Sequence, residues 1–178
     1  MAVVTTKSVT IGNRDASPSV INDGRLERGG LRSSVGFVTV GAADSATSYF
    51  PLVSVPSNAM VRGIFATNPA GMTTLAVDIG VFKNTRDSGG ALLGTAANTG
   101  SGTFFATAVS LAVANDKLNV TNESTTNTFI LQNQPLWQAI GLTADPATTF
   151  DIGMKITTAN TGAAGFAGIE VQYVDNGN

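Results

Sequence analysis

Hydrophobic and polar residues alternate in short stretches over most of the chain, from about residue 34 onward. β-Branched and aromatic residues fill these stretches, and clusters of Gly, Pro, Asn and Asp separate them, which is typical of an all-β protein. The clearest stretch is Thr74 to Phe82, where every second residue is a large aliphatic one: Leu75, Val77, Ile79 and Val81. We expect this face to point into the core, with Asp78 and Gly80 on the opposite face.

The same pattern predicts about eight strands. They are expected at residues 35–40, 49–55, 59–67, 74–82, 118–121, 128–131, 150–157 and 165–174, with a hairpin loop between the last two. Pro51 removes a hydrogen-bond donor from the second strand, which predicts a sheet edge or a bulge. Eight strands at this spacing favour a β-sandwich with a jelly-roll-like arrangement, although the sequence does not reveal the strand order.

Two segments between the strands favour helix. Residues 102–116 fit either a helical stripe or, over 106–113, an extended strand. We interpret them as a short helix, whose stripe would consist of Phe104, Phe105, Ala108, Leu111 and Ala112. Residues 135–140 predict one or two helical turns, because Pro135 suits the first helical position. Trp137 in these turns is expected to fill the core rather than to stack on a sugar or a base.

The first 34 residues show no sustained helical or strand period. Glycines and Pro18 interrupt regular structure throughout this segment. Its spaced apolar residues nevertheless provide anchors that a solvated tail would not need: Val9, Ile11, Val20, Ile21, Leu26 and Leu31. Disorder is the alternative interpretation. We interpret residues 1–34 as an extended N-terminal arm that a partner orders, and residues 35–178 as one β-sandwich domain.

The chain contains few charged residues, and their distribution is uneven. Asp, Glu, Lys and Arg make up 12% of the 178 residues, about half of the usual ~25%. The net charge is −2, with +2 in residues 1–32 and −4 in the remainder. Nucleic acids and anionic membranes bind clustered Lys and Arg, so we expect neither as a partner. Without Cys, an apolar export signal or a long apolar run, we expect a soluble protein made in the cytoplasm.

The sequence lacks the residues that most enzymes use for catalysis. Without His or Cys, Ser-His-Asp and Cys-His catalysis and sites that bind metals through these residues are impossible. A carboxylate pair of the glycosidase type remains, and its candidates are Asp78, Asp151 and Glu170. Each alternates with inward apolar neighbours, so we expect each to project from the solvent face of its strand. Phosphate- and calcium-binding spacings are absent as well. We therefore predict no enzyme, no catalytic residue, no cofactor and no metal.

Several short segments, distributed over nearly the whole chain, carry a resemblance to a known protein family. They are TTKS (Thr5 to Ser8), GNRDASP (Gly12 to Pro18), GRL (Gly24 to Leu26), VGFVTV (Val35 to Val40), VPSNA (Val55 to Ala59), DIGVF (Asp78 to Phe82), PLW (Pro135 to Trp137) and Asp145-Pro146. Together they resemble a family of small tailed-bacteriophage virion proteins found alongside the major capsid protein. The resemblance implies a head decoration, or cement, protein: a β-sandwich on the outer surface of the head and an arm that reaches across capsid subunits.

The leading hypothesis is therefore a capsid decoration protein that stabilises the head by bridging subunits of the major capsid protein. It would be made in the cytoplasm of the host bacterium and act in the virion as a homo-oligomer, with a trimer favoured. Many weak, repeated contacts suit such a protein, and planar guanidinium groups suit acidic partners. The arm residues expected to bind the capsid are Arg14, Asp15, Arg25, Leu26, Arg28 and Arg32.

Two alternatives from other classes remain at this stage. A phage tail or fibre module would bind host-surface carbohydrate through a sandwich loop or Trp137. A glycosidase would need two of the three strand carboxylates close together, and its activity would be lost in Asp78→Asn or Glu170→Gln.

Overall fold

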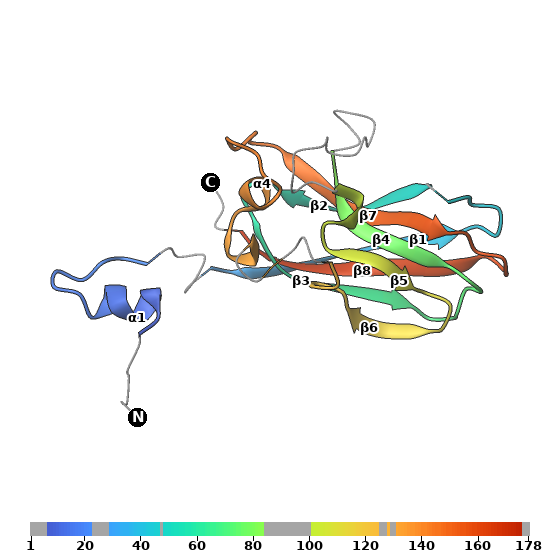
Figure 1. Cartoon of the computed structure of the whole chain (residues 1–178), viewed down its shortest axis with the longest axis horizontal. Coiled ribbons are helices and arrows are strands. Elements are labelled where there is room, and N and C mark those ends of the chain that lie inside the picture. The colour runs from blue at the N-terminus through green and yellow to red at the C-terminus, as the bar shows by residue number, and fades with distance from the viewer. Residues whose placement is uncertain are drawn as a thin grey trace, which may run out of the picture.

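Figure 1 shows a computed structural model of the chain, which describes residues 7–22, 29–46, 48–83, 101–124, 128 and 131–175. In these residues the fold is the predicted all-β sandwich, with eight strands in two four-stranded antiparallel sheets. The strands are β1 (Leu31–Val40), β2 (Tyr49–Pro56), β3 (Met60–Asn68), β4 (Ala76–Lys83), β5 (Ala106–Ser110), β6 (Asn115–Asn119), β7 (Thr149–Thr158) and β8 (Gly165–Val174).

The strand order identifies the sandwich as a jelly roll. Sheet A has the order β1-β8-β3-β6, and sheet B has the order β2-β7-β4-β5. Every connection between successive strands crosses from one sheet to the other, except the one between β4 and β5, which are neighbours in sheet B. The expected hairpin between β7 and β8 is therefore wrong, because these strands belong to different sheets.

The core lies between the inner faces of the two sheets. Leu75, Val77, Ile79 and Val81 are all fully buried in or beside β4, which confirms the face predicted from their alternation. Sheet A contributes Ile64 from β3 and Val171 from β8 to the same cluster. Successive side chains of a strand point to opposite faces, so a single alternating pattern was sufficient to define the inner side.

Strand β2 behaves as Pro51 predicts. It is an edge strand of sheet B, and its pairing with β7 shifts register between Pro51 and Val53. At this edge the two sheets approach each other closely, since a Cβ atom on Gly36 of β1 would lie 2.2 Å from the carbonyl oxygen of Leu52. Glycine is the residue that permits this approach.

The helix expected in residues 102–116 is wrong. The segment forms a short 3-10 helix η1 (Ser101–Thr103), then β5 and the start of β6. The rings of Phe104 and Phe105 meet edge to face at 4.9 Å, and both are buried, so these neighbours do not follow a helical stripe. Strand β5 pairs with β4 and β6 with β3. Hydrogen bonding to these distant strands decides the conformation where the local pattern is ambiguous.

The segment before β7 contains the predicted helical turns. They form the short helix α4 (Leu136–Ala139), with Pro135 at the N-cap, one position before the expected one. A 3-10 helix η2 (Leu131–Asn133), which was not predicted, precedes it. The backbone N–H of Trp137 donates to the carbonyl of Ser57 at 2.9 Å, and the Trp137 ring packs, partly buried, against the core as expected. Of the strand expected at 128–131, Thr128 is in no element, Leu131 begins η2, and the other two residues lie outside the described ones.

We expect Ile152→Ala to lower the free energy of unfolding by about 2–5 kcal/mol. Ile152 lies fully buried on the inner face of β7, so the truncation leaves a cavity between the sheets. Val113→Ala, at an exposed position, is the control and should change it by less than about 0.5 kcal/mol. Urea denaturation followed by circular dichroism measures both, and equal effects would contradict the assignment of this face to the core.

Candidate interaction surfaces

The N-terminal segment, residues 7–22, contains one turn and a half of helix where no regular structure was expected. Helix α1 (Val9–Arg14) is capped by Ser8, whose hydroxyl oxygen accepts a hydrogen bond from the N–H of Ile11 at 3.3 Å. Ser is a favoured N-cap residue because its side chain replaces a missing carbonyl partner. The cap satisfies one of the backbone N–H groups that have no partner at the start of a helix.

Two asparagines close this segment into a loop. The Asn13 side-chain amide donates to the side-chain oxygen of Asn22 at 2.8 Å, and the Asn22 amide donates to the carbonyl of Thr10 at 3.1 Å. The N–H of Val20 also donates to the Asn13 carbonyl at 3.0 Å. Polar contacts hold these residues together, since none of the helix residues is buried.

The charged residues of the segment are paired with one another. The Asp15 carboxylate lies 2.8 Å from Nε of Arg14 and 2.9 Å from Nζ of Lys7. Hydrogen bonds from Arg14 and then from Lys7 lower the pKa of Asp15 below its ordinary value. The Arg14 side chain is 66% exposed, so its guanidinium is paired with the adjacent Asp15 and still reaches solvent.

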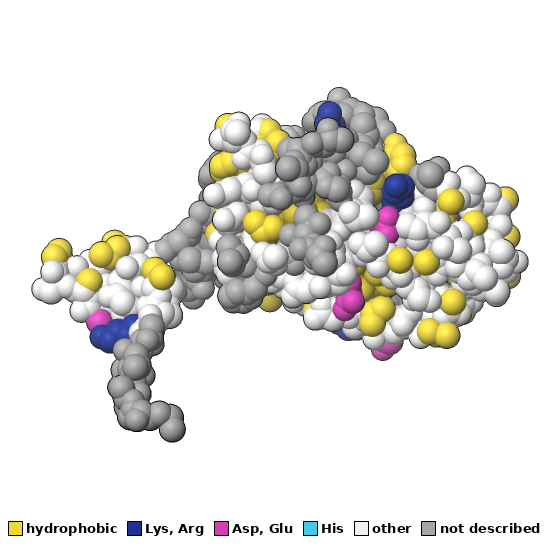
Figure 2. All heavy atoms as spheres, in the orientation of Figure 1, with side chains coloured by type: hydrophobic (Ala, Val, Ile, Leu, Met, Phe, Trp, Pro, Cys, Tyr) yellow, Lys and Arg dark blue, Asp and Glu magenta, His cyan; other side chains and the backbone are white. Residues whose placement is uncertain are grey.

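The apolar residues of the segment are exposed. The side chain of Ile21 is 96% exposed, and Val9 and Val20 are exposed too. Figure 1 shows the segment standing apart from the sandwich, and Figure 2 shows hydrophobic side chains on one side of it and charged ones on the other. A segment with apolar groups and no core of its own is suited to packing on another surface.

The other predicted arm residues occupy different positions. Arg32 lies in β1, because that strand begins at Leu31 rather than at Val35, and its guanidinium is 3.5 Å from the Asp175 carboxylate. Arg25, Leu26 and Arg28 lie outside the described residues. The structure therefore brings Arg14 and Asp15 together but does not describe a common site for all six.

An apolar surface that the sequence analysis missed lies on the outer face of sheet A. Phe37 of β1 is 67% exposed, Phe166 of β8 is 62% exposed, and Val35 of β1 is 54% exposed. The Phe37 ring lies over Gly168, where an added Cβ would be only 2.4 Å from the ring. The run from Val35 to Val40 is apolar on both faces of the strand, and this pattern could have predicted an exposed apolar surface.

Beside these side chains, polar groups on the same face surround Glu170. Its carboxylate accepts hydrogen bonds from Ser33 at 2.9 Å and Gln172 at 3.1 Å, and it lies 3.1 Å from Nζ of Lys117. The hydrogen bonds from Gln172, Lys117 and Ser33, in that order, lower the pKa of Glu170. Glu170 does project from the outer face of its strand, where it has a structural hydrogen-bonding role.

The solvent-face prediction is wrong for the other two carboxylates. Asp78 is only 5% exposed and Asp151 only 7%. The Asp78 carboxylate accepts a hydrogen bond at 2.9 Å from the N–H of Ala108, a residue of β5 with a positive φ of 52°. The β4–β5 register shifts at this point, so Asp78 satisfies a backbone donor at a bulge. A buried face can accept an acidic residue when that residue is hydrogen bonded.

The three carboxylates are not brought together into a glycosidase pair. Asp151 lies opposite Phe82 and Asp78 lies opposite Lys155 in the β4–β7 ladder. Four residues of strand therefore separate the two aspartates, about 13 Å at ~3.3 Å per residue, beyond the roughly 5–9.5 Å that glycosidases need. Glu170 is in the other sheet.

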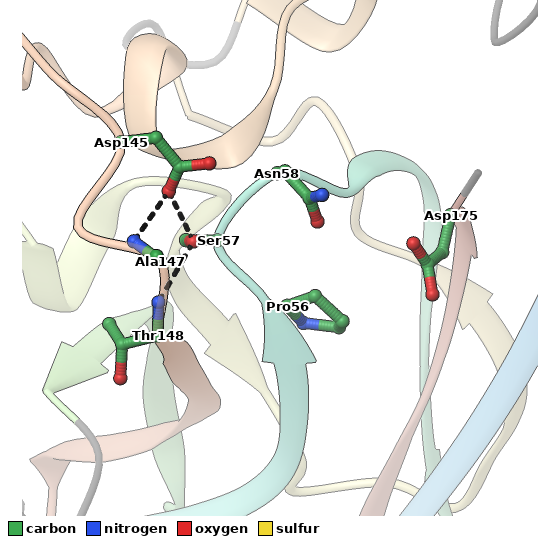
Figure 3. Close-up of a pocket in the computed structure, with 7 residues that line it drawn as sticks. All are labelled: Pro56, Ser57, Asn58, Asp145, Ala147, Thr148 and Asp175. Atoms are coloured by element: carbon green, nitrogen blue, oxygen red, sulfur yellow. Dashed lines mark hydrogen bonds between the residues drawn. The ribbon is translucent and has the colours of Figure 1, made fainter. Parts of the chain in front are cut away.

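A small polar pocket lies at the end of the sandwich where β2 meets β3 (Figure 3). The Ser57 hydroxyl donates to Asp145 at 2.6 Å, and Asp145 also accepts from the N–H of Ala147 at 2.9 Å. The N–H of Thr148 donates to Ser57 at 3.3 Å. The volume is about 250 Å³, below the about 300–1,000 Å³ of usual ligand sites. These bonds tie two loops together, and the Ser57 proton is already committed to Asp145.

Neither a metal centre nor a membrane helix occurs among the residues that the structure describes. They contain no group of three or more acidic, His or Cys side chains that could hold a metal ion. No helix in this part of the chain is long and apolar enough to cross a membrane.

We expect Asp78→Ala to destabilise the fold by about 1–3 kcal/mol, because the part-buried hydrogen bond between the Ala108 N–H and the charged Asp78 carboxylate is lost. Asp78→Asn keeps a side-chain oxygen and should cost less. Asp116→Ala, at an exposed carboxylate, is the control. The measurement is the free energy of unfolding from urea denaturation, and an Asp78→Ala protein as stable as the control would show that the bond does not support the bulge.

We also expect Glu170 to make stability depend on pH. Its pKa is lowered in the folded chain, so the ionised group stabilises the fold above the pKa of the unfolded state, and this contribution is lost as pH falls through the folded pKa. The wild type should unfold at a higher temperature than Glu170→Gln near about pH 6, and the difference should shrink as pH falls below the ordinary pKa of 4.5. Scanning calorimetry of both proteins measures this, and a difference that is constant with pH would contradict it.

Comparisons with known proteins support the fold. No protein-family model and no curated protein matches the chain. The chain is similar to one in "Capsid of Ralstonia phage GP4", with a TM-score of 0.55 and 14% identity, covering 85% of this chain and 89% of that one. A chain in "Cyanophage Pam1 capsid asymmetric unit" aligns with a TM-score of 0.44 and 14% identity, covering 87% and 91%. One in "Acidic stable capsid structure of Helicobacter pylori bacteriophage KHP30" aligns with a TM-score of 0.41 and 13% identity, covering 82% and 89%. At this identity, the likeness to the Ralstonia phage chain shows a shared fold.

Proposed function

We propose that the protein is a structural virion protein that decorates the outer surface of a bacteriophage head and is not an enzyme. The observation that carries the proposal is the N-terminal segment, which is held together by its own polar contacts while Val9, Val20 and Ile21 are exposed. Exposing these side chains to water is unfavourable, and a partner surface would remove them from it.

The fold supports the same proposal. Eight-stranded jelly rolls are common in viral capsid proteins, and the chain that shares this fold with a TM-score of 0.55 comes from a phage capsid. Fold alone does not define a function, so the role is argued from the surfaces. The carboxylates that an enzyme would need are apart or engaged in structural hydrogen bonds.

The arm would bind the major capsid protein and bridge its subunits. Its net positive charge would complement acidic groups on the shell, and Arg14, Arg25 and Arg28 would supply guanidinium groups, with Asp15 orienting Arg14 at 2.8 Å. Leu26 would add an apolar anchor. Arg32 would contribute at the junction of the arm and β1, beside Asp175. A homo-oligomer, with a trimer favoured, would multiply these weak contacts.

The carbohydrate-binding alternative receives no support from Trp137. That ring packs against the core, and its backbone is tied to Ser57, so it does not form an open stacking platform.

We expect a protein that lacks residues 1–28 to fold but to lose most of its binding to undecorated heads. The truncation ends before β1, so the pairing of β1 with β8 is retained. Cosedimentation with purified undecorated shells measures binding, and circular dichroism checks the fold. Undiminished binding would overturn the role of the arm.

A second variant tests the apolar side chains alone: a full-length chain with Val9, Val20 and Ile21 changed to Ser. It keeps every charge of the arm and removes its exposed apolar groups. A loss of binding comparable to that of the truncation is expected, and binding equal to wild type would mean that these apolar groups are not the anchors.

A further inference from the structure

Each sheet of the sandwich ends in two edge strands, and an edge strand presents unpaired backbone groups to any chain that can pair with it. Among the strands of the described residues, the edges are β1 and β6 in sheet A, and β2 and β5 in sheet B. Natural proteins protect such edges with proline, bulges, charges or short strands. The four edges can therefore be compared for proline, bulges, charged residues and strand length.

Three of the four edges carry such protection. Strand β2 contains Pro51 and a register shift. Strands β5 and β6 have five residues each and are interrupted by residues with positive φ, Ala108 at 52° and Lys117 at 54°. In each case a side chain of the neighbouring strand accepts a hydrogen bond from this residue. Asp78 of β4 accepts from the N–H of Ala108, and Thr67 of β3 accepts from the N–H of Lys117. A further strand would find no regular row of partners on these edges.

Strand β1 has none of these features. It is ten residues long and pairs with β8 from Leu31 opposite Val174 to Val40 opposite Gly165, without a register shift. It contains no Pro and no Lys, and its one charged residue, Arg32, lies near its start and 3.5 Å from Asp175. Its outward side chains Val35 and Phe37 are more than half exposed.

We propose that β1 is a self-association edge, which pairs antiparallel with β1 of a second copy of this chain. The register that places Gly36 opposite Gly36 brings Val35 of each copy opposite Phe37 of the other. Aromatic residues paired across strands with β-branched ones stabilise antiparallel sheets. The two sheets A then form one continuous sheet of eight strands about a two-fold axis.

A second copy fits this edge for a reason of charge. A two-fold axis sets each strand position against a position of the same strand, so charged residues near the axis would face like charges. Residues 33–40 of β1 contain no charged side chain, and the nearest carboxylate, Glu170 of β8, is bonded to Ser33, Gln172 and Lys117. Burying this edge against itself leaves no unpaired charge.

The pairing also has a consequence for the arms. Each arm precedes β1, and Figure 1 shows the N-terminal segment beyond the start of that strand. Antiparallel pairing would direct the two arms to opposite ends of the joined sheet. The inference concerns the free protein and does not depend on capsid attachment. If the chain also forms the trimer favoured above, pairing through β1 would join copies of different trimers, so the free protein would contain an even number of copies.

The chain contains no cysteine, so any disulfide formed in the test joins the introduced residues. Val35→Cys and Phe37→Cys chains, each full length, are mixed and oxidised. Facing residues in antiparallel strands have Cα atoms about 4.5–5.5 Å apart, inside the roughly 4.4–6.8 Å range of disulfides. The mixture should yield a disulfide-linked heterodimer at least about tenfold faster than Val35→Cys mixed with the control Val113→Cys, an exposed site away from β1.

A second measurement does not rely on disulfides. Val35→Lys places a charge on the edge and should weaken self-association by at least about tenfold in sedimentation equilibrium, while circular dichroism remains that of the wild type. Val113→Lys should associate as the wild type does. A strictly monomeric or trimeric wild type, or cross-linking of the Val35→Cys and Phe37→Cys pair no faster than the control, would overturn the proposal. Preferential Val35 to Val35 linkage would overturn the register.

Discussion

The packing of the two inner sheet faces against each other is the interaction on which the rest of the structure depends. The central strands of both sheets contribute fully buried aliphatic side chains, among them Ile64, Ile79 and Val171. Burial of each such side chain stabilises the fold by about 1.5–3 kcal/mol relative to exposure. Because the chain contains no disulfide and its charged residues are few, this burial is the main source of stability, and the edges and loops are built around it.

Around that core, neutral and acidic side chains form hydrogen bonds with backbone N–H and carbonyl groups that have no partner within the sheets. Asn68 is fully buried and donates to the carbonyls of Ala70, Leu111 and Val113. Thr121 accepts from the N–H of Ile64, and Asp78 accepts from that of Ala108. Buried polar groups are tolerated when they are satisfied in this way. The same bonds explain why carboxylates that look available for chemistry in the sequence are structural in the fold.

Two surfaces of the described residues are apolar and lie outside the core. One is the exposed side of the N-terminal segment, and the other is the outer face of β1 and β8 around Phe37 and Phe166. Exposed apolar groups of this kind suit binding to other protein surfaces. Under the two proposals made above, one surface would bind the shell and the other a neighbouring copy of this chain.

The sequence by itself determined the all-β class, the inner face of β4, the edge position of Pro51 and the helical turn before β7. These follow from alternation and from proline chemistry, which act within a few residues. Tertiary structure decided the jelly-roll order, the conversion of residues 106–110 into a strand, and the burial of Asp78 and Asp151, because each depends on a partner strand distant in the chain. It also decided that Val35 and Phe37 are exposed, since both faces of that run are apolar and only the packing of sheet A against sheet B determines which one is covered.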